Sequence, residues 1–260
     1  MNVFILTDLE GIAGVNSITC MERGSEDYKR ACLALCHSIN LAADTCFTCG
    51  ADAVYYLDGH GGGGNVDESL IDPRAVKCDI AKWQSLLQTG GVDCQIELGC
   101  HARAGTMGGF LDHTFSSKAY FSQRINGREM SELSCHAIVC AAYGVPLIAC
   151  IGDRASCEQA AEYVPGIFTG IVKHAERRNS ATDVQDPDRV LVETIRAALD
   201  GKDRVELFSL PAPHTVELTF YRTDMCDKSF DKGDPTVERV DARTLRRRVA
   251  RILRYEDLKF

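Results

Sequence analysis

The chain has 260 residues, of which 45% are hydrophobic and 25% are charged, a composition typical of a globular protein with one large domain, alone or beside a smaller one. The formal net charge of -8 argues against nucleic acid as a partner, because a phosphate-binding surface needs clustered basic residues. No stretch approaches the roughly 18 apolar residues of a membrane span, so we expect no membrane contact.

The first element that we expect is a strand from Val3 to Asp8. Its apolar run lacks a basic region and a small-residue cleavage site, which predicts a cytoplasmic protein rather than a secreted one. Three later runs are also apolar, short and without period-two alternation, as in parallel strands that are covered on both faces. They are Ala53 to Asp58, Cys94 to Gly99 and Val145 to Gly152.

Helical patterns fall between and after these strands. They cover Glu26 to Gly50, Met130 to Tyr143, Ala155 to Tyr163 and Asp188 to Leu199. The alternation predicts an α/β fold with a doubly wound, mostly parallel sheet and helices on both faces. We expect the thirteen cysteines to be free thiols that pack as small hydrophobic side chains, the C-x-x-C pair of Cys46 and Cys49 included.

The pattern changes after about residue 200. Thr215 to Tyr221 alternates like a half-exposed strand, and Ala242 to Tyr255 has the pattern of a basic amphipathic helix. We therefore predict an α/β domain at 1–200. Residues 201–260 form a smaller antiparallel and helical portion, as an extension or a small second lobe. The arginines of this segment indicate a solvated helix face or a subunit contact.

Acidic residues and histidines follow three of the predicted strands. Asp8 and Glu10 end the first strand, His60 follows the second and His101 the third. Because the carboxyl ends of parallel strands share one edge of a sheet, these side chains should lie close together. The helix near Met130 adds Glu132 in its first turn.

This combination of side chains points to metal chemistry. Carboxylates and imidazoles suit zinc, and two histidines with three carboxylates exceed the needs of one catalytic ion. They suit a two-metal site with a bridging carboxylate, for which Asp8 is the candidate because it closes the central strand. His136, one turn after Glu132, should pack or form a hydrogen bond, or else support a ligand from behind.

Several of these motifs also resemble those of a known family. The stretch Thr7-Asp8-Leu9-Glu10-Gly11 resembles the S-x-D-x-E-G signature of the zinc D-aminopeptidases that are encoded with dipeptide permeases. Later motifs follow in the family's order: Asp58-Gly59-His60-Gly61, His101-Ala102-Arg103-Ala104-Gly105-Thr106 and Leu111-Asp112-His113-Thr114. The resemblance covers roughly the first 180 residues well and the remainder to about residue 255 more loosely.

The resemblance implies a zinc metallopeptidase that removes an N-terminal D-amino acid from small peptides. It implies two zinc ions per subunit and a ring-shaped homo-oligomer. The implied metal ligands are Asp8, Glu10, His60, His101 and Glu132, and the implied catalytic residue is His113, as acid/base or nucleophile. Thr7 replaces the serine of the signature.

Two other functions remain open at this point. The same ligands would serve a dinuclear amidohydrolase or phosphohydrolase of another small substrate, although Arg103 is the one basic residue close to the motifs. A metal-dependent peptide-binding protein without catalysis is the non-enzymatic alternative. Arg103 and Lys118 are candidates to bind a peptide carboxylate or are solvated surface residues.

Overall fold

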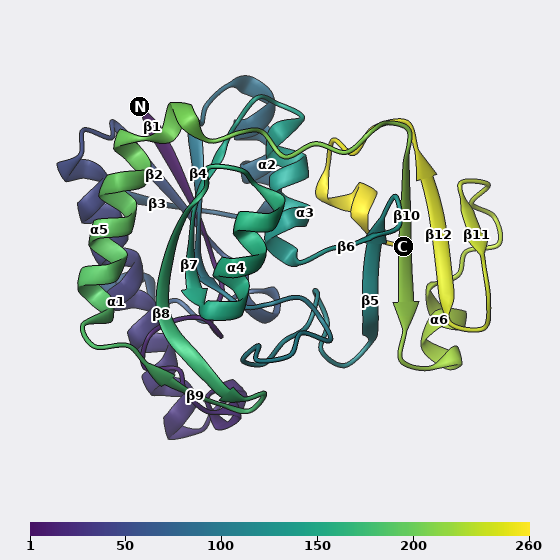
Figure 1. Ribbon diagram of the computed structural model, residues 1–260, viewed down its shortest axis with the longest axis horizontal. Coiled ribbons are helices and arrows are strands. Elements are labelled where there is room, and N and C mark those ends of the chain that lie inside the picture. Colours follow the sequence, from purple (N-terminus) through teal and green to yellow (C-terminus); the bar gives the residue numbers. More distant parts are fainter.

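The computed structural model describes residues 1–260 and contains two β-sheets that lie side by side (Figure 1). The large sheet has the strand order β3-β2-β1-β4-β7-β8-β9, and all its neighbours are parallel except β8 and β9. Its strands are β1 (Asn2–Thr7), β2 (Ala53–Asp58), β3 (Ala75–Cys78), β4 (Cys94–Cys100), β7 (Leu147–Asp153), β8 (Phe168–Arg177) and β9 (Ser180–Asp183).

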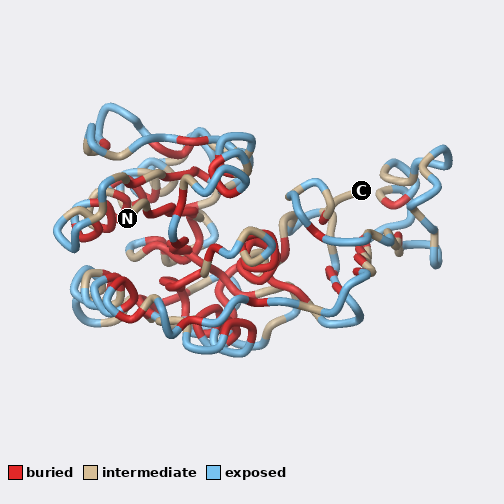
Figure 2. The backbone as a smooth tube through the Cα atoms, turned by 90° about the horizontal axis from the view of Figure 1, so that it is seen from above, coloured by how far each residue is buried: buried red, intermediate tan, exposed pale blue.

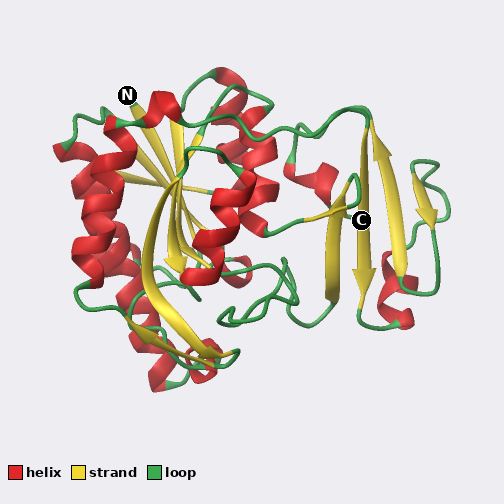
Figure 3. Cartoon of the chain, viewed as in Figure 1, coloured by secondary structure: helices red, strands yellow, loops and turns green.

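Five helices cover the two faces of the large sheet. They are α1 (Glu26–Thr48), α2 (Ile80–Thr89), α3 (Glu132–Ala141), α4 (Arg154–Tyr163) and α5 (Pro187–Asp200). Helices α1 and α5 lie on one face and α2, α3 and α4 on the other (Figures 1 and 3). The structure therefore confirms the doubly wound α/β fold, and each predicted strand and helix of this region is present within about two residues of its expected ends.

The helices start where capping residues allow. Ser25 accepts a hydrogen bond from the backbone N–H of Tyr28 at the start of α1, and Ser131 does the same for Ser134 at the start of α3. Each cap satisfies an N–H that has no partner within the helix. The cap at Ser131 fixes Glu132 as the first residue of α3.

Strand order reverses between β1 and β4. From β1, the chain continues outward through β2 and β3 on one side, and β4 begins the other half of the sheet. Such a switch point leaves a crevice outside the carboxyl ends of the two strands, because the loops that follow them turn in opposite directions. Asp8 follows β1 and His101 follows β4, so both enter this crevice.

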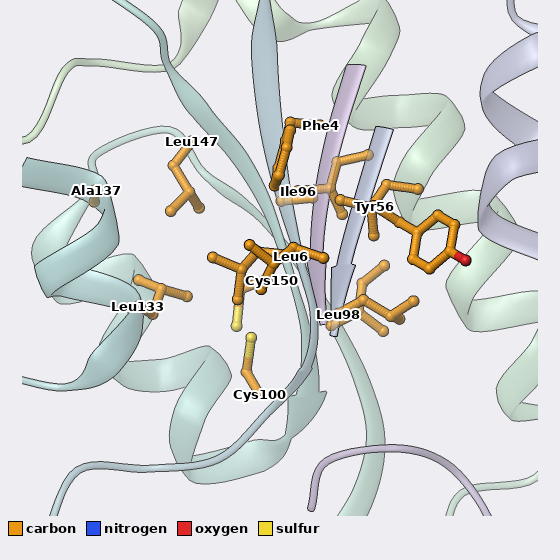
Figure 4. Packing of buried hydrophobic residues seen from close by; sticks show 14 of the residues in the cluster. Phe4, Leu6, Tyr56, Ile96, Leu98, Cys100, Leu133, Ala137, Leu147 and Cys150 are labelled. Atoms are coloured by element: carbon orange, nitrogen blue, oxygen red, sulfur yellow. The ribbon is translucent and has the colours of Figure 1, made fainter. Parts of the chain in front are cut away.

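The core of the molecule lies between the large sheet and its helices. Figure 2 shows the buried segments concentrated there, and Figure 4 shows Phe4, Ile96 and Leu147 in this packing. All thirteen cysteines are free thiols, and eleven of them are buried, as expected for small apolar side chains. Cys32 is half-buried and Cys49 is exposed, so the packing expected of the Cys46 and Cys49 pair is wrong for Cys49. No helix has the length and apolar character that crossing a membrane would need.

The small sheet is antiparallel and has the strand order β11-β12-β10-β5-β6. Its strands are β5 (Tyr120–Ile125), β6 (Arg128–Glu129), β10 (His214–Phe220), β11 (Val237–Arg239) and β12 (Thr244–Val249), and the short helix α6 (Thr223–Ser229) follows β10. The hairpin of β5 and β6 thus comes from the middle of the chain. The division of the chain at residue 200 stays a prediction.

The predicted basic helix from Ala242 to Tyr255 is wrong. Residues Thr244–Val249 form β12, which pairs with β10 so that Arg246 lies opposite Glu217. The Arg246 guanidinium is 2.6 Å from the Glu217 carboxylate. Cross-strand ion pairs of this kind stabilise a strand that the local sequence alone does not specify.

Candidate metal centre

The candidate site lies at the lower edge of the large sheet in Figure 1, where β1, β2 and β4 end. The backbones after β1 and β4 approach each other closely. Gly99 has a φ of +84°, and a Cβ atom on it would lie 2.1 Å from the carbonyl oxygen of Asp8. Only glycine allows this contact, which draws the loop of Asp8 toward the loop of His101.

The first set of side chains gathers around His60. Its Nδ1 atom lies 3.1 Å from Oδ1 of Asp8 and 2.9 Å from Oε2 of Glu10. The loop that carries His60 is held by Asp58, whose carboxylate accepts hydrogen bonds from the backbone and side-chain nitrogens of Asn65. Asn65 also donates to the carbonyl oxygen of His60. Asp58 therefore shapes the loop and does not face the cluster.

The second set gathers around His101. Its Nε2 atom lies 3.1 Å from Oδ2 of Asp8 and 3.3 Å from Oε1 of Glu132. The Nδ1–H donates to the carbonyl oxygen of Ala102, which leaves Nε2 as the nitrogen that carries the lone pair when the ring is neutral. This buried Nε2 has no hydrogen-bond partner of suitable geometry, so it is free to coordinate a cation.

The carboxylate of Asp8 lies between the two sets, with one oxygen toward each histidine. Three groups of carboxylate and imidazole atoms are compact enough to hold a metal ion. They are Asp8 with Glu10 and His60, Asp8 with His101 and Glu132, and Glu10 with His101 and His113. Borderline divalent ions prefer this mixture of oxygen and nitrogen ligands. The residues present therefore fit a metal centre.

The electrostatics of the cluster reflect its burial and its opposite charges. Burial raises the pKa of Asp8, but the facing His101 and His60 outweigh it and hold that pKa well below its usual range. Burial lowers the pKa of His60, whereas Asp8 and Glu10 raise it to a net value of about 11. The pKa of His101 is likewise raised, against burial, by Asp8 and Glu132. In the absence of metal the imidazoles hold protons at the positions that a divalent cation would take.

His113 borders the same cluster from the loop between β4 and β5. Its ring stacks on that of His101, with centroids 4.0 Å apart. Its Nδ1–H donates to the carbonyl oxygen of Leu111 at 2.8 Å, and its Nε2 lies 3.7 Å from Oε1 of Glu132. The free Nε2 therefore points into the carboxylate cluster. All six side chains that the sequence indicated come together here.

Asp112, from the motif that contains His113, and Asp153, at the end of β7, have other partners. The carboxylate of Asp112 accepts hydrogen bonds from the backbone of Gly105 and Thr106 and pairs with Arg178 at 3.0 Å. It does not orient His113, which the carbonyl of Leu111 holds instead. Asp153 caps α4 and accepts from the backbone N–H of Phe110, so it fixes the far end of the same loop.

His136 forms a hydrogen bond, as expected, but with a partner that the sequence did not suggest. Its Nδ1 lies 3.1 Å from Oε1 of Glu97, a residue of β4 that is 4% exposed. Gln95 donates to the same carboxylate and accepts from the indole N–H of Trp83. A buried polar network therefore lies directly behind the metal-ligand positions. Two polar residues at alternate positions, Gln95 and Glu97, in an otherwise apolar strand are the signal that marks it.

Lys173 of β8 is another residue near the site that the sequence patterns did not indicate. Its side chain is fully buried, and its ammonium donates to the backbone carbonyl oxygens of Glu10, Ile12 and Val15. It also lies 5.1 Å from the ring centroid of Phe110. Lys173 thus holds the loop after β1 in the shape that presents Asp8 and Glu10.

A carboxylate and imidazole cluster at the switch point of a parallel α/β sheet is the kind of site that metal-dependent hydrolases use. Comparison with known families makes the class specific. Residues 1–256 match the Peptidase_M55 family, described as D-aminopeptidase, and the chain belongs to this family. It is therefore a metal-dependent aminopeptidase, as the motifs of the sequence implied.

Individual relatives agree with this assignment. The chain is 29% identical to a D-aminopeptidase of Bacillus subtilis (strain 168) over 231 residues, which is 85% of this chain and 81% of the relative. Its fold matches that of the Zn-dependent D-aminopeptidase DppA from Bacillus subtilis, a self-compartmentalizing protease, with a TM-score of 0.90. That match covers 99% of this chain and 95% of DppA at 24% sequence identity.

Proposed function

We propose that this protein removes N-terminal D-amino acids from short peptides with the help of two zinc ions per subunit. The observation that carries the proposal is the position of Asp8, whose two carboxylate oxygens face different histidines. One ion would be held by Asp8, Glu10 and His60 and the other by Asp8, His101 and Glu132. Asp8 would then serve as a ligand of both ions. Zinc is the metal named for the structural relative DppA.

The chemistry divides between the ions and the protein. When bound, a pair of divalent ions lowers the pKa of water and polarises the scissile carbonyl group. The protein's own part is to hold the ligands and to move protons. His113 is placed for proton transfer, because its Nδ1 is fixed by Leu111 and its Nε2 faces the carboxylates of the cluster.

The assembly that we propose is a ring-shaped homo-oligomer in the cytoplasm that encloses its active sites. Support comes from the description of DppA as self-compartmentalizing. Some large apolar side chains also lie on the surface, among them Met107 at 97% exposure and Phe121 at 52%. Size-exclusion chromatography with light scattering tests the assembly, and a monomer at micromolar concentration would contradict it.

The central experiment compares the hydrolysis of D-Ala-D-Ala and L-Ala-L-Ala by metal-loaded protein. We expect D-selective release of alanine and its loss in His113→Ala, because that variant lacks the proton-transferring imidazole. Metal analysis of the same samples should give about two ions per chain in both proteins. Absence of turnover of either dipeptide at full metal content would overturn the substrate assignment.

A further inference from the structure

The metal-ligand cluster borders a cavity of about 530 Å³ that no part of the proposed metal chemistry uses. Glu132 forms part of its lining and also belongs to the cluster. Its lining includes the glycine loop from Gly61 to Gly64 and, from the end of the chain, Tyr255 and Lys259. The volume falls within the range of about 300–1,000 Å³ of small-molecule sites.

Lys259 is the cation of this cavity without an ion-pair partner. Its ammonium lies 3.9 Å from the ring centroid of Tyr255 and 5.7 Å from that of Phe115. Lys77, the other lysine of the lining, is held by Glu68 at 2.6 Å. No carboxylate of the protein pairs with Lys259 in this way. A half-buried ammonium over aromatic rings has lost part of its hydration and attracts an anion.

The position of Lys259 is built by the fold. The carbonyl oxygen of Leu258 accepts a hydrogen bond of 2.9 Å from Gln123 of β5, and the carbonyl of Lys259 accepts from Arg247 of β12. The backbone N–H of Tyr255 donates to Gln84 of α2 at 3.2 Å. The last residues are thereby fastened to the small sheet and to α2, and Lys259 is held at the lining of the cavity.

The charge of the surroundings also bears on this lysine. Burial lowers the pKa of Lys259, while the carboxylates of Glu132 and Glu256 act in the opposite direction. Glu132 belongs to the cluster that would neutralise bound metal ions, so its charge is not available to Lys259 in the loaded protein. A negative group of the substrate would take that place.

We propose that Lys259 binds the free α-carboxylate of the peptide substrate and so makes this enzyme selective for very short peptides with an unblocked C-terminus. The inference rests on the proposed aminopeptidase function. An aminopeptidase places the N-terminal residue at the metal ions, so the rest of the peptide must occupy the adjoining cavity. Each residue added to the peptide would move its C-terminal carboxylate by about 3.3–3.6 Å. The carboxylate of a longer peptide would therefore lie away from Lys259, whose position in the cavity is fixed.

The test compares a dipeptide acid with its amide. D-Ala-D-Ala and D-alanyl-D-alaninamide differ in the C-terminal charge and not in the scissile bond. We expect metal-loaded wild type to prefer the acid about 10- to 100-fold in kcat/KM, the range of one charge-assisted hydrogen bond. Lys259→Met should lose this preference through a higher KM for the acid, with the amide unchanged. Lys259→Arg should restore part of it.

Lys118→Met is the matched control, because Lys118 is exposed and does not line the cavity; it should keep the wild-type preference. Calorimetry gives a readout besides turnover. The His113→Ala variant should bind D-Ala-D-Ala more tightly than D-alanyl-D-alaninamide. The variant that carries both His113→Ala and Lys259→Met should bind the two ligands equally. Equal losses on acid and amide, or no loss on either, would overturn the role of Lys259 and leave the aminopeptidase standing. Absence of turnover by the wild type would contradict both the role of Lys259 and the proposed aminopeptidase function.

Discussion

The large parallel sheet has a continuous core of 60 buried residues, whereas the small antiparallel sheet has a separate core of four. Those four are Leu218, Phe220, Cys226 and Leu245. Other residues of the small sheet and its tail, such as Val216 and Ile252, belong to the large core. So small a core does not support independent folding.

The two sheets also contribute differently to the site. The large sheet, its helices and the loops after its strands supply every proposed metal ligand, and the small sheet with its tail supplies part of the lining of the adjoining cavity. Changes in the large sheet should therefore affect metal binding and stability. Changes in the small sheet should affect substrate selection and leave the metals in place.

The largest effect that we expect is that of Asp8→Asn. The amide offers one neutral oxygen in place of a carboxylate that faces both histidines. The affinity for both ions should therefore fall together. The kcat/KM should fall on the order of 10³-fold or more, and elemental analysis should find less than one ion per chain. His60 belongs to only one of the two ligand sets, so His60→Ala should keep the ion that Asp8, His101 and Glu132 would hold. Full metal content in Asp8→Asn would contradict the shared position of Asp8.

Lys173→Met tests how the large sheet holds the loop after β1. Methionine fills a similar volume but leaves the carbonyl oxygens of Glu10 and Val15 without a donor and that of Ile12 with only the N–H of Val15. Buried acceptors without partners cost about 1–3 kcal/mol each, so we expect the free energy of unfolding to fall by about 3 kcal/mol, with weaker metal binding. Urea titration measures this. Lys118→Met serves as the exposed control, and equal stability of the two variants would refute the prediction.

The pH dependence of metal binding should follow the histidines. With a pKa of about 11, His60 is protonated at neutral pH in the metal-free protein, so each ion must displace protons. We expect the apparent metal affinity to rise about tenfold per pH unit between pH 7 and 9 for each proton displaced. Competition with a chelator of known affinity measures it, and a flat profile would show that no proton is displaced.

The same shift fixes the sign of a stability change. The folded-state pKa of His60 lies above its ordinary value of 6.5. Its contribution to stability is therefore complete below pH 6.5 and is lost as the pH rises toward 11. The melting temperature of the metal-free protein should fall across this interval, and that of the metal-loaded protein should fall less.

The smallest effect should come from Arg246→Ala in the small sheet. Its pair with Glu217 spans neighbouring strands and is partly exposed, and pairs of this kind contribute about 0.2–1 kcal/mol. We expect a loss of less than about 1 kcal/mol, with kcat and metal content unchanged. A loss of metal in this variant would break the division of roles between the sheets.

The sequence was sufficient for the four central strands of the large sheet, β2, β1, β4 and β7, and for the residues at their ends, because both depend on short patterns. Buried parallel strands such as β1 and β7 are continuous apolar runs, and their ends are marked by Asp8 or by the aspartate that caps the next helix. Parallel pairing then places the ends together without further information. The six candidate site residues, from Asp8 to Glu132, were found in this way and through the family motifs.

The remaining parts depend on contacts between distant segments. The arginines of β12 have a spacing that also suits a helix, and only pairing with Glu217 of β10 decides for a strand. Lys173 lies in β8, which the sequence pattern did not reveal, and its partners are backbone atoms over 150 residues earlier. Nothing in the local sequence distinguishes Lys259 from other charged residues, because its position at the cavity depends on the folding of the tail.

The thirteen free thiols give the unfolded chain a chemistry that the folded protein hides. Thiolates are soft ligands for zinc, and unfolding would expose the eleven that are buried here. Zinc in excess would then bind the unfolded chain as well as the native site, which reduces its net stabilising effect. During synthesis or refolding, the metal is best delivered at low free concentration, after the thiols are already enclosed.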